Sequence, residues 1–213
     1  MANTLAPFGF AQVGTASGKP NFAQAGSASP YKIKASFTTQ IFYGDAVRMW
    51  ISGDSSSGAA GYITPWVNGD GAAGATAILV GIFLGCEYYS SSQRQNVKSQ
   101  FWPGGDAAAD GTAFVCDDPE SQWMVQAGTA ATPFTQAYVG ATADVTASPT
   151  GNTTTGISGM TLGTPTNTPA SLPFKFVNVI TTPPTANGRD LATAYNYVTV
   201  AFNNQQYKAL LGV

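Results

Sequence analysis

The sequence predicts an all-β protein, either an antiparallel sandwich or a barrel, with long Gly/Thr-rich loops and an extended N-terminal arm. Many short segments alternate between apolar and polar residues, which is the two-residue period of a strand. Turn-forming residues separate these segments, and the chain contains 24 Gly and 13 Pro. Many short strands joined by such turns are typical of sandwiches and closed barrels.

The longest apolar run, ILVGIFLGCEYY at residues 78–89, is expected to be the central strand. It is too short for a membrane-spanning helix, which needs roughly 20 apolar residues, and its β-branched and aromatic residues favour a strand. Alternation predicts that every second side chain of this strand lines one apolar face. The residues of that face are Val80, Ile82, Leu84, Cys86 and Tyr88. Gly81 and Gly85 are then expected to mark a bend, a bulge or a close approach of backbone.

Further strands are expected on both sides of this run. Those before it lie at residues 31–37, 41–43, 46–51 and 62–67. Those after it lie at residues 111–116, 121–127, 172–180 and 195–202. The strand at 62–67 contains Pro65, which lacks an amide hydrogen, and it is therefore expected at a sheet edge. Gly44 and Asp45 form a turn signal, and residues 117–119 form a corner between two strands.

The chain is expected to divide into an arm, residues 1–27, and a β-rich body, residues 28–213. Within the body, residues 92–100 could form a short helix or a polar excursion. Residues 128–170 are low in charge and rich in Thr, Ala and Gly, so we expect a long surface excursion with one or two short strands. Loops of this length in compact domains are usually functional.

The arm contains mainly Gly, Ala, Ser, Asn and Gln and shows no period of a helix or strand. Its isolated aromatic residues are Phe8, Phe10 and Phe22. Two interpretations remain open. The arm is either a disordered terminus or a segment that becomes ordered only on a partner, with the three Phe residues as contacts.

Charge is scarce in this chain. Charged residues make up 9%, against about 25% in an ordinary soluble domain, and the formal net charge is −2. A surface of small polar residues suits packing against other proteins, although secreted adhesins and lectins also have low charge. The densest cationic pair, Lys32 and Lys34, falls in a predicted strand, so we expect no binding to nucleic acid or to a membrane surface.

No pattern of catalytic or cofactor-binding residues is present. The chain has no His, which removes the commonest general base and metal ligand, and two Cys cannot alone form a zinc site. We expect no metal, no cofactor and no enzymatic activity. Cys86 and Cys116 are expected to be buried free thiols. The start, MANTLAPFGFAQVG, lacks the pattern of a secretory signal, so we expect folding in a cytoplasm.

Carboxylates and tryptophans give weaker candidates for a site. Three carboxylates cluster at the corner: Asp117, Asp118 and Glu120. They could hydrolyse a glycoside or bind calcium, but a solvated turn in which Asp117 caps backbone groups is favoured. Glu87 lies among apolar residues and is expected to form a salt bridge with Arg48 or Arg94, or to face a subunit boundary, rather than to act in catalysis. The tryptophans that could form a sugar-binding platform are Trp50, Trp66, Trp102 and Trp123, although their spread over different strands favours core or interface packing.

Two nearby stretches resemble a known family: IFLGCEYYSSSQRQNVKSQFWPGG at 82–105 and AFVCDDPESQWMVQAG at 113–128. Together with APFGF at 6–10 and the late Asn-x-x-x-Tyr that ends at Tyr207, they resemble small virion proteins of tailed phages. The shared features are a G-C-E-Y strand, a W-P turn and a V-x-D-D-P corner. Such proteins often have His near the late Tyr, where this chain has Gln205 and Gln206.

The resemblance implies a capsid decoration, or cement, protein. Such a protein is non-enzymatic, is made in the host bacterial cytoplasm, and binds the outside of the assembled head. There it bridges major capsid protein subunits, often as a homotrimer. The candidate partner-binding residues are Phe8, Phe10, Phe22, Trp102 and Tyr207. The alternatives are another head or tail component such as a fibre or connector, a glycan-binding adhesin module, and an enzyme.

Overall fold

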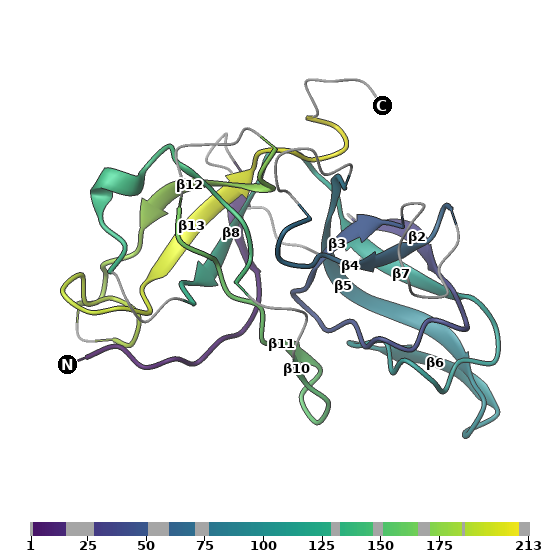
Figure 1. Cartoon of the computed structure of the whole chain (residues 1–213). Coiled ribbons are helices and arrows are strands. Elements are labelled where there is room, and N and C mark those ends of the chain that lie inside the picture. The colour runs from purple at the N-terminus through teal and green to yellow at the C-terminus, as the bar shows by residue number, and fades with distance from the viewer. Residues whose placement is uncertain are drawn as a thin grey trace.

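The computed structural model describes residues 2–15, 28–50, 60–70, 77–128, 133–146, 151–165, 171–184 and 186–208. In this part the chain is nearly all β, and its strands form antiparallel sheets (Figure 1). The sheets are not closed into a barrel, so the sandwich is confirmed and the barrel is not. No helix among the described residues has the length and hydropathy needed to cross a membrane.

Two main sheets contain most of the strands. The first sheet has the order β1 (Ala11–Thr15), β8 (Ser121–Gln126), β13 (Tyr197–Phe202), β12 (Phe174–Val179) and β9 (Thr142–Ala143). The second has the order β2 (Ser29–Ile33), β7 (Gly111–Cys116), β5 (Leu79–Ser90), β3 (Ala46–Met49) and β4 (Ile63–Pro65), with β6 (Gln95–Ser99) also paired to β5. A small separate hairpin joins β10 (Gly151–Asn152) to β11 (Ile157–Ser158). One 3-10 turn, η1, covers Gln136–Tyr138.

The predicted corner at residues 117–119 carries the chain from the second sheet to the first. β7 ends at Cys116 and β8 begins at Ser121, as the sequence pattern predicts. The carboxylate of Asp118 accepts a hydrogen bond from the backbone N–H of Glu120 at 3.0 Å, so Asp118 rather than Asp117 caps the turn. The strand that contains Pro65 lies at a sheet edge, as expected.

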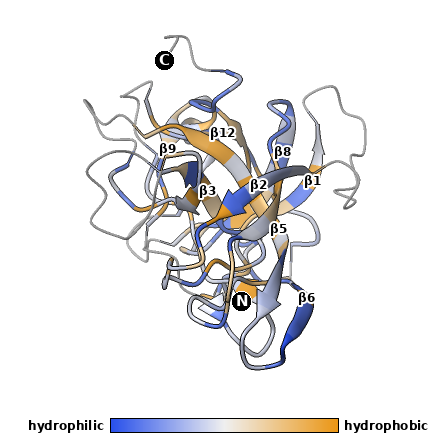
Figure 2. Ribbon diagram, turned by 90° about the vertical axis from the view of Figure 1, so that its right-hand side faces the viewer, coloured by the Kyte–Doolittle hydropathy of each residue, from blue (hydrophilic) through white to orange (hydrophobic). Residues whose placement is uncertain are grey.

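The second sheet is covered on both faces. One cluster of buried side chains lies between the two sheets and includes Phe10, Leu79, Ile82, Trp123 and Phe174. A second cluster covers the other face of the second sheet and includes Ile33, Val80, Phe83, Trp102 and Val115. In Figure 2, β6 is hydrophilic, whereas β12 carries hydrophobic residues.

The expected single apolar face of β5 is wrong, because both faces of this strand are buried. Ile82 packs in the cluster between the sheets, and Val80 and Cys86 pack in the cluster on the other side. Ile82 lies on the side opposite to Val80 and Cys86 because β5 has two register shifts. One is against β3, and the other is against β7, between Phe83 and Gly85. Each shift adds a residue to one strand of the pair and so reverses the side to which later residues point. The expected bulge at Gly85 is confirmed, and its φ is 138°.

The close backbone approach expected at the β5 glycines occurs at Gly81. A Cβ atom at this position would collide with the carbonyl oxygen of Cys116 on β7. We therefore expect Gly81→Ala to lower the free energy of unfolding by about 1–3 kcal/mol, the usual range for overpacking. Urea unfolding would measure the loss. Gly105→Ala is the matched control, since a Cβ there meets no atom within 4 Å. Equal stability of the two variants would contradict this account of Gly81.

Both thiols are free and buried, as predicted. β5 and β7 are neighbours, but Cys86 and Cys116 belong to the clusters on opposite faces of the sheet. Burial raises the pKa of the Cys86 thiol to about 12, and it also raises the pKa of Cys116. Neither thiol is therefore a reactive nucleophile at neutral pH.

Two loop predictions require correction. Residues 95–99 form strand β6, which is mostly exposed and polar and pairs with β5 in a hairpin, so the short helix is wrong and the polar excursion agrees with the structure. Residues 128–170 are not only a surface excursion, because Phe134, Met160 and Leu162 are fully buried. The expected strand at 172–180 is observed as β12, but buried and exposed residues alternate only in its first half, since a register shift between Phe176 and Asn178 turns Val179 inward.

Candidate functional site

Phe10, expected to contact a partner, is instead part of the core. Its side chain is only 1% exposed, and its ring stacks on that of Phe174 with centroids 4.4 Å apart. Its backbone N–H donates to the carbonyl oxygen of Gly44 at 2.9 Å. The following residues form β1, which pairs with β8 at the edge of the first sheet.

The residues before Phe10 are held by amide side chains of the body. The Asn3 side chain donates to the carbonyl oxygens of Asp190 and Ala194, each at 2.9 Å. The side chain of Gln126 accepts the N–H of Ala6 at 2.8 Å and donates to the carbonyl oxygen of Thr4 at 2.9 Å. An arm ordered only on a partner is therefore wrong for residues 2–15, which pack on their own chain (Figure 1). Residues 16–27, with Phe22, lie outside the described part.

The other predicted contact residues have different environments. Trp102 is fully buried, and its Nε1–H donates to the carbonyl oxygen of Phe37 at 3.0 Å, so it packs on the body rather than on a partner. Phe8 is half-buried, with its ring edge-to-face against Tyr197. Tyr207 is 64% exposed. Among those of the five candidates that the structure describes, only Phe8 and Tyr207 are exposed enough to contact another molecule.

The carboxylate candidates have structural roles. Asp117 accepts hydrogen bonds from the hydroxyls of Ser29 at 2.9 Å and Tyr31 at 2.7 Å. Burial and the bond to Asp117 raise the pKa of Tyr31. Glu87 pairs with Lys98 at 3.8 Å rather than with either expected arginine. Among the described residues, no group of three or more His, Cys, Asp or Glu could hold a metal ion.

The tryptophans do not form a sugar-binding platform. Trp66, Trp102 and Trp123 are all fully buried. Arg48, one of the expected partners of Glu87, forms an ion pair with Asp70 at 2.7 Å.

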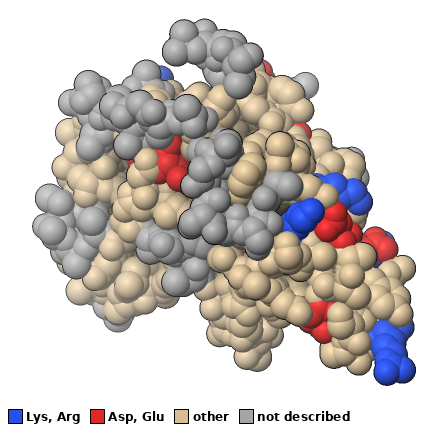
Figure 3. Space-filling view, turned by 45° about the vertical axis from the view of Figure 1, so that its right-hand side comes forward, with Lys and Arg blue, Asp and Glu red and all other residues tan. Residues whose placement is uncertain are grey.

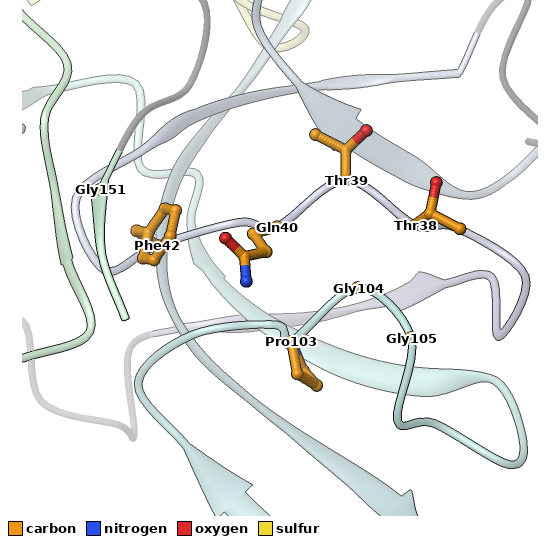
Figure 4. A pocket seen from close by; sticks show the side chains of 8 residues that line it. All are labelled: Thr38, Thr39, Gln40, Phe42, Pro103, Gly104, Gly105 and Gly151. Atoms are coloured by element: carbon orange, nitrogen blue, oxygen red, sulfur yellow. The ribbon is translucent and has the colours of Figure 1, made fainter. Parts of the chain in front are cut away.

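Two open grooves lie side by side on the surface. The first has a volume of about 520 Å³ and is lined by Thr38, Thr39, Gln40, Phe42, Pro103, Gly104, Gly105 and Gly151. The second has a volume of about 430 Å³ and is lined by Pro7, Phe8, Gly151, Asn152, Thr155, Ile157, Ser158 and Gly159. Figure 4 shows the first groove, with the 38–42 segment facing the 103–105 loop and Phe42 beside Gly151. Gly151 lines both grooves, so they flank the hairpin to which it belongs.

This projecting hairpin, residues 151–158, extends away from the two sheets (Figure 1). Its base is paired with residue 43: the Tyr43 N–H donates to the carbonyl oxygen of Gly156, and the Ser158 N–H donates to that of Tyr43, each at 2.9 Å. The Phe42 ring lies directly against Gly151, where a Cβ would collide with it. The hairpin is therefore fixed at its base and exposed at its tip.

A buried carboxylate lies beneath the hairpin. Asp45 is fully buried and accepts hydrogen bonds from the Ser158 hydroxyl at 2.5 Å and the Phe42 N–H at 2.7 Å. The Ser158 hydroxyl oxygen in turn accepts the N–H of Met160 at 2.9 Å. Burial raises the pKa of Asp45 to about 7, although its two hydrogen bonds oppose the rise.

The sequence predicts a turn at Asp45, but it does not predict that this carboxylate is buried and bonded to the hairpin. The available signal was its position directly before the apolar strand that begins at Ala46. A turn carboxylate next to a largely buried strand can point inward when it accepts a hydrogen bond from a donor that is distant in the sequence. That donor, Ser158, is 113 residues away, which local patterns do not reveal.

The surface around the grooves carries little charge. None of the described residues that line either groove is Lys, Arg, Asp or Glu. On the face shown in Figure 3, the described charged side chains form a few separate groups, and most of the other described atoms are uncharged. Such a surface can be buried against a partner without desolvating charges.

Fold and surface together define a β-sandwich with a fixed projecting hairpin and two grooves lined by uncharged residues. Comparison of the chain with known protein families, curated proteins and solved structures found no match.

Proposed function

We propose that the chain is a non-enzymatic virion structural protein, a capsid decoration or cement protein. It would bind the outside of the assembled phage head and bridge major capsid protein subunits, acting as a homotrimer. The main observation behind the proposal is the pair of surface grooves lined by uncharged residues. These grooves lie on a sandwich whose second sheet has a buried cluster on each face. The resemblance of residues 82–105 and 113–128 to such virion proteins supports it.

The proposed action requires only binding energy. A protein that binds the assembled shell, and not its free subunits, shifts the equilibrium toward the shell. Repetition of the contact over a symmetric lattice makes a modest affinity effective, because neighbouring contacts act together. A low-charge surface suits this role, because many copies are then buried without an accumulated cost of charge desolvation.

The test uses heads of the virus that encodes this chain, prepared with and without it. We expect the purified protein to co-sediment with chain-free heads to a fixed number of copies and to raise the temperature at which they release DNA. Electron cryomicroscopy should then show density outside the shell. Density confined to the tail or portal would support a fibre or connector instead, and no binding to any part of the virion would overturn a virion role.

A further inference from the structure

We propose that the projecting hairpin and the two grooves beside it form the surface that contacts the partner, and that this partner is an uncharged protein surface on the assembled shell. The inference rests on the proposed function and assigns it to a particular part of the molecule. It is carried by the exposure of the hairpin, by its fixed base and by the absence of charge among the described residues lining the grooves.

The hairpin presents atoms that a protein partner can reach. Residues 151–155 are exposed, and Ile157, near the base, is 40% exposed. The Asn152 side-chain oxygen accepts the N–H groups of Thr154 at 2.8 Å and Thr155 at 3.3 Å, which shapes the tip before any partner binds. The grooves leave room on both sides for chain segments of the partner.

The base of the hairpin is rigid for three separate reasons. The Ser158 hydroxyl bonds to buried Asp45, the backbone at Tyr43 pairs with the second arm of the hairpin at Gly156 and Ser158, and Gly151 on the first arm lies against the Phe42 ring. Gly9 also lies close to the base, since a Cβ at this position would be 2.5 Å from that of Ser158. An element that is already ordered loses little conformational entropy on binding, which favours affinity.

The chemistry of the surface favours an uncharged protein over a glycan. An interface without charged groups gains nothing from a charged partner, which would lose its own hydration on burial. Glycan sites commonly offer a fully exposed aromatic face, but Phe42 in the first groove is only 2% exposed, and Phe8 in the second groove is half-buried with its ring against Tyr197. Three of the four tryptophans are buried elsewhere in the chain.

The deciding experiment places a charge on the tip. Thr154→Glu introduces a carboxylate at an exposed position that its partner would bury, and Thr154→Ala removes only the hydroxyl. Gln93→Glu is the matched control, because Gln93 is exposed at the tip of the other long hairpin, between β5 and β6, and the variant has the same net charge. Each variant is first compared with the wild type by thermal unfolding and then bound to chain-free heads.

We expect Thr154→Glu to weaken head binding at least about tenfold, Thr154→Ala to have a small effect, and Gln93→Glu to bind like the wild type. Wild-type affinity should change little with ionic strength, because no charged pairs are formed. Unchanged binding of Thr154→Glu, or a steep salt dependence, would overturn the inference and leave the proposed function standing. If the wild type itself fails to bind heads, both are overturned. Binding of the wild type to a glycan array, with loss of that binding in Thr154→Glu, would instead identify a glycan partner and overturn the inference.

Discussion

Phe10→Ala is expected to destabilise the fold by about 3–5 kcal/mol, the usual cost of truncating a buried phenylalanine. The ring is almost fully enclosed and stacks on Phe174, so its removal leaves a cavity between the two sheets. For a chain of this size the melting temperature should fall by roughly 6–20 °C. Urea unfolding monitored by tryptophan fluorescence would give the free energy directly.

The control for this change lies in the same segment. Val13 is 46% exposed on β1, and Val13→Ala should alter stability by no more than about 0.5 kcal/mol. If Phe10 were instead a contact residue of an arm bound to a partner, its truncation would weaken binding to the partner and leave the stability of the free protein unchanged. If Phe10→Ala kept the wild-type melting temperature and only weakened attachment to heads, the placement of Phe10 in the core would be contradicted.

Strands with strong local patterns could be predicted closely from the sequence. The bounds of β7 were predicted to the residue, because alternating residues end at the Asp-Asp-Pro corner. β8 was predicted within one residue for the same reason. The central strand β5 was also expected, with a bulge at one of its glycines. In these segments the alternation and the turn residues agree, so local information is sufficient.

The faces of the strands could not be predicted in the same way. A bulge depends on the register between two strands, and the partner of a residue is set by the whole sheet. Ile82 and Cys86 therefore point to opposite sides of the second sheet, although alternation places them together. Strand β6 was not predicted because its residues are mostly polar and show no apolar alternation. It forms because its backbone pairs with β5.

The site was the least predictable part, because distant residues create it. The N-terminal segment has the composition of an arm, yet Asn3 and Phe10 are fixed by residues more than 160 positions away. The hairpin at 151–158 has no apolar pattern of its own and depends on Tyr43 and Asp45 for its position. Composition indicated a surface of low charge, but it could not indicate where the two grooves lie on that surface.

Asp45 is expected to make the folded protein less stable as the pH rises from about 4 to about 7. Its carboxyl has an ordinary pKa of 3.8 when unfolded and a pKa of about 7 in the fold, so the folded state binds the extra proton between these values. Stability should therefore fall by about 1.4 kcal/mol per pH unit from this group, or about 4 kcal/mol in all. Asp106 and Asp110 have lowered pKa values, so the stability they contribute is lost below this window, in acid.

The variant Asp45→Asn should remove this dependence while keeping the contacts. The amide oxygen can still accept the Phe42 N–H, and the amide nitrogen can donate to the Ser158 hydroxyl. Urea unfolding of both proteins at several values between pH 4 and pH 8 would measure the difference between them at each pH, which cancels the other titrating groups. We expect wild-type stability to fall relative to the variant by about 4 kcal/mol across this range. Glu120→Gln, at an exposed carboxylate of the corner, is the control and should follow the wild type. Parallel curves for the wild type and Asp45→Asn would mean that water or a rearrangement of the hairpin relieves the buried charge, and the rigid base inferred for residues 151–158 would then be wrong.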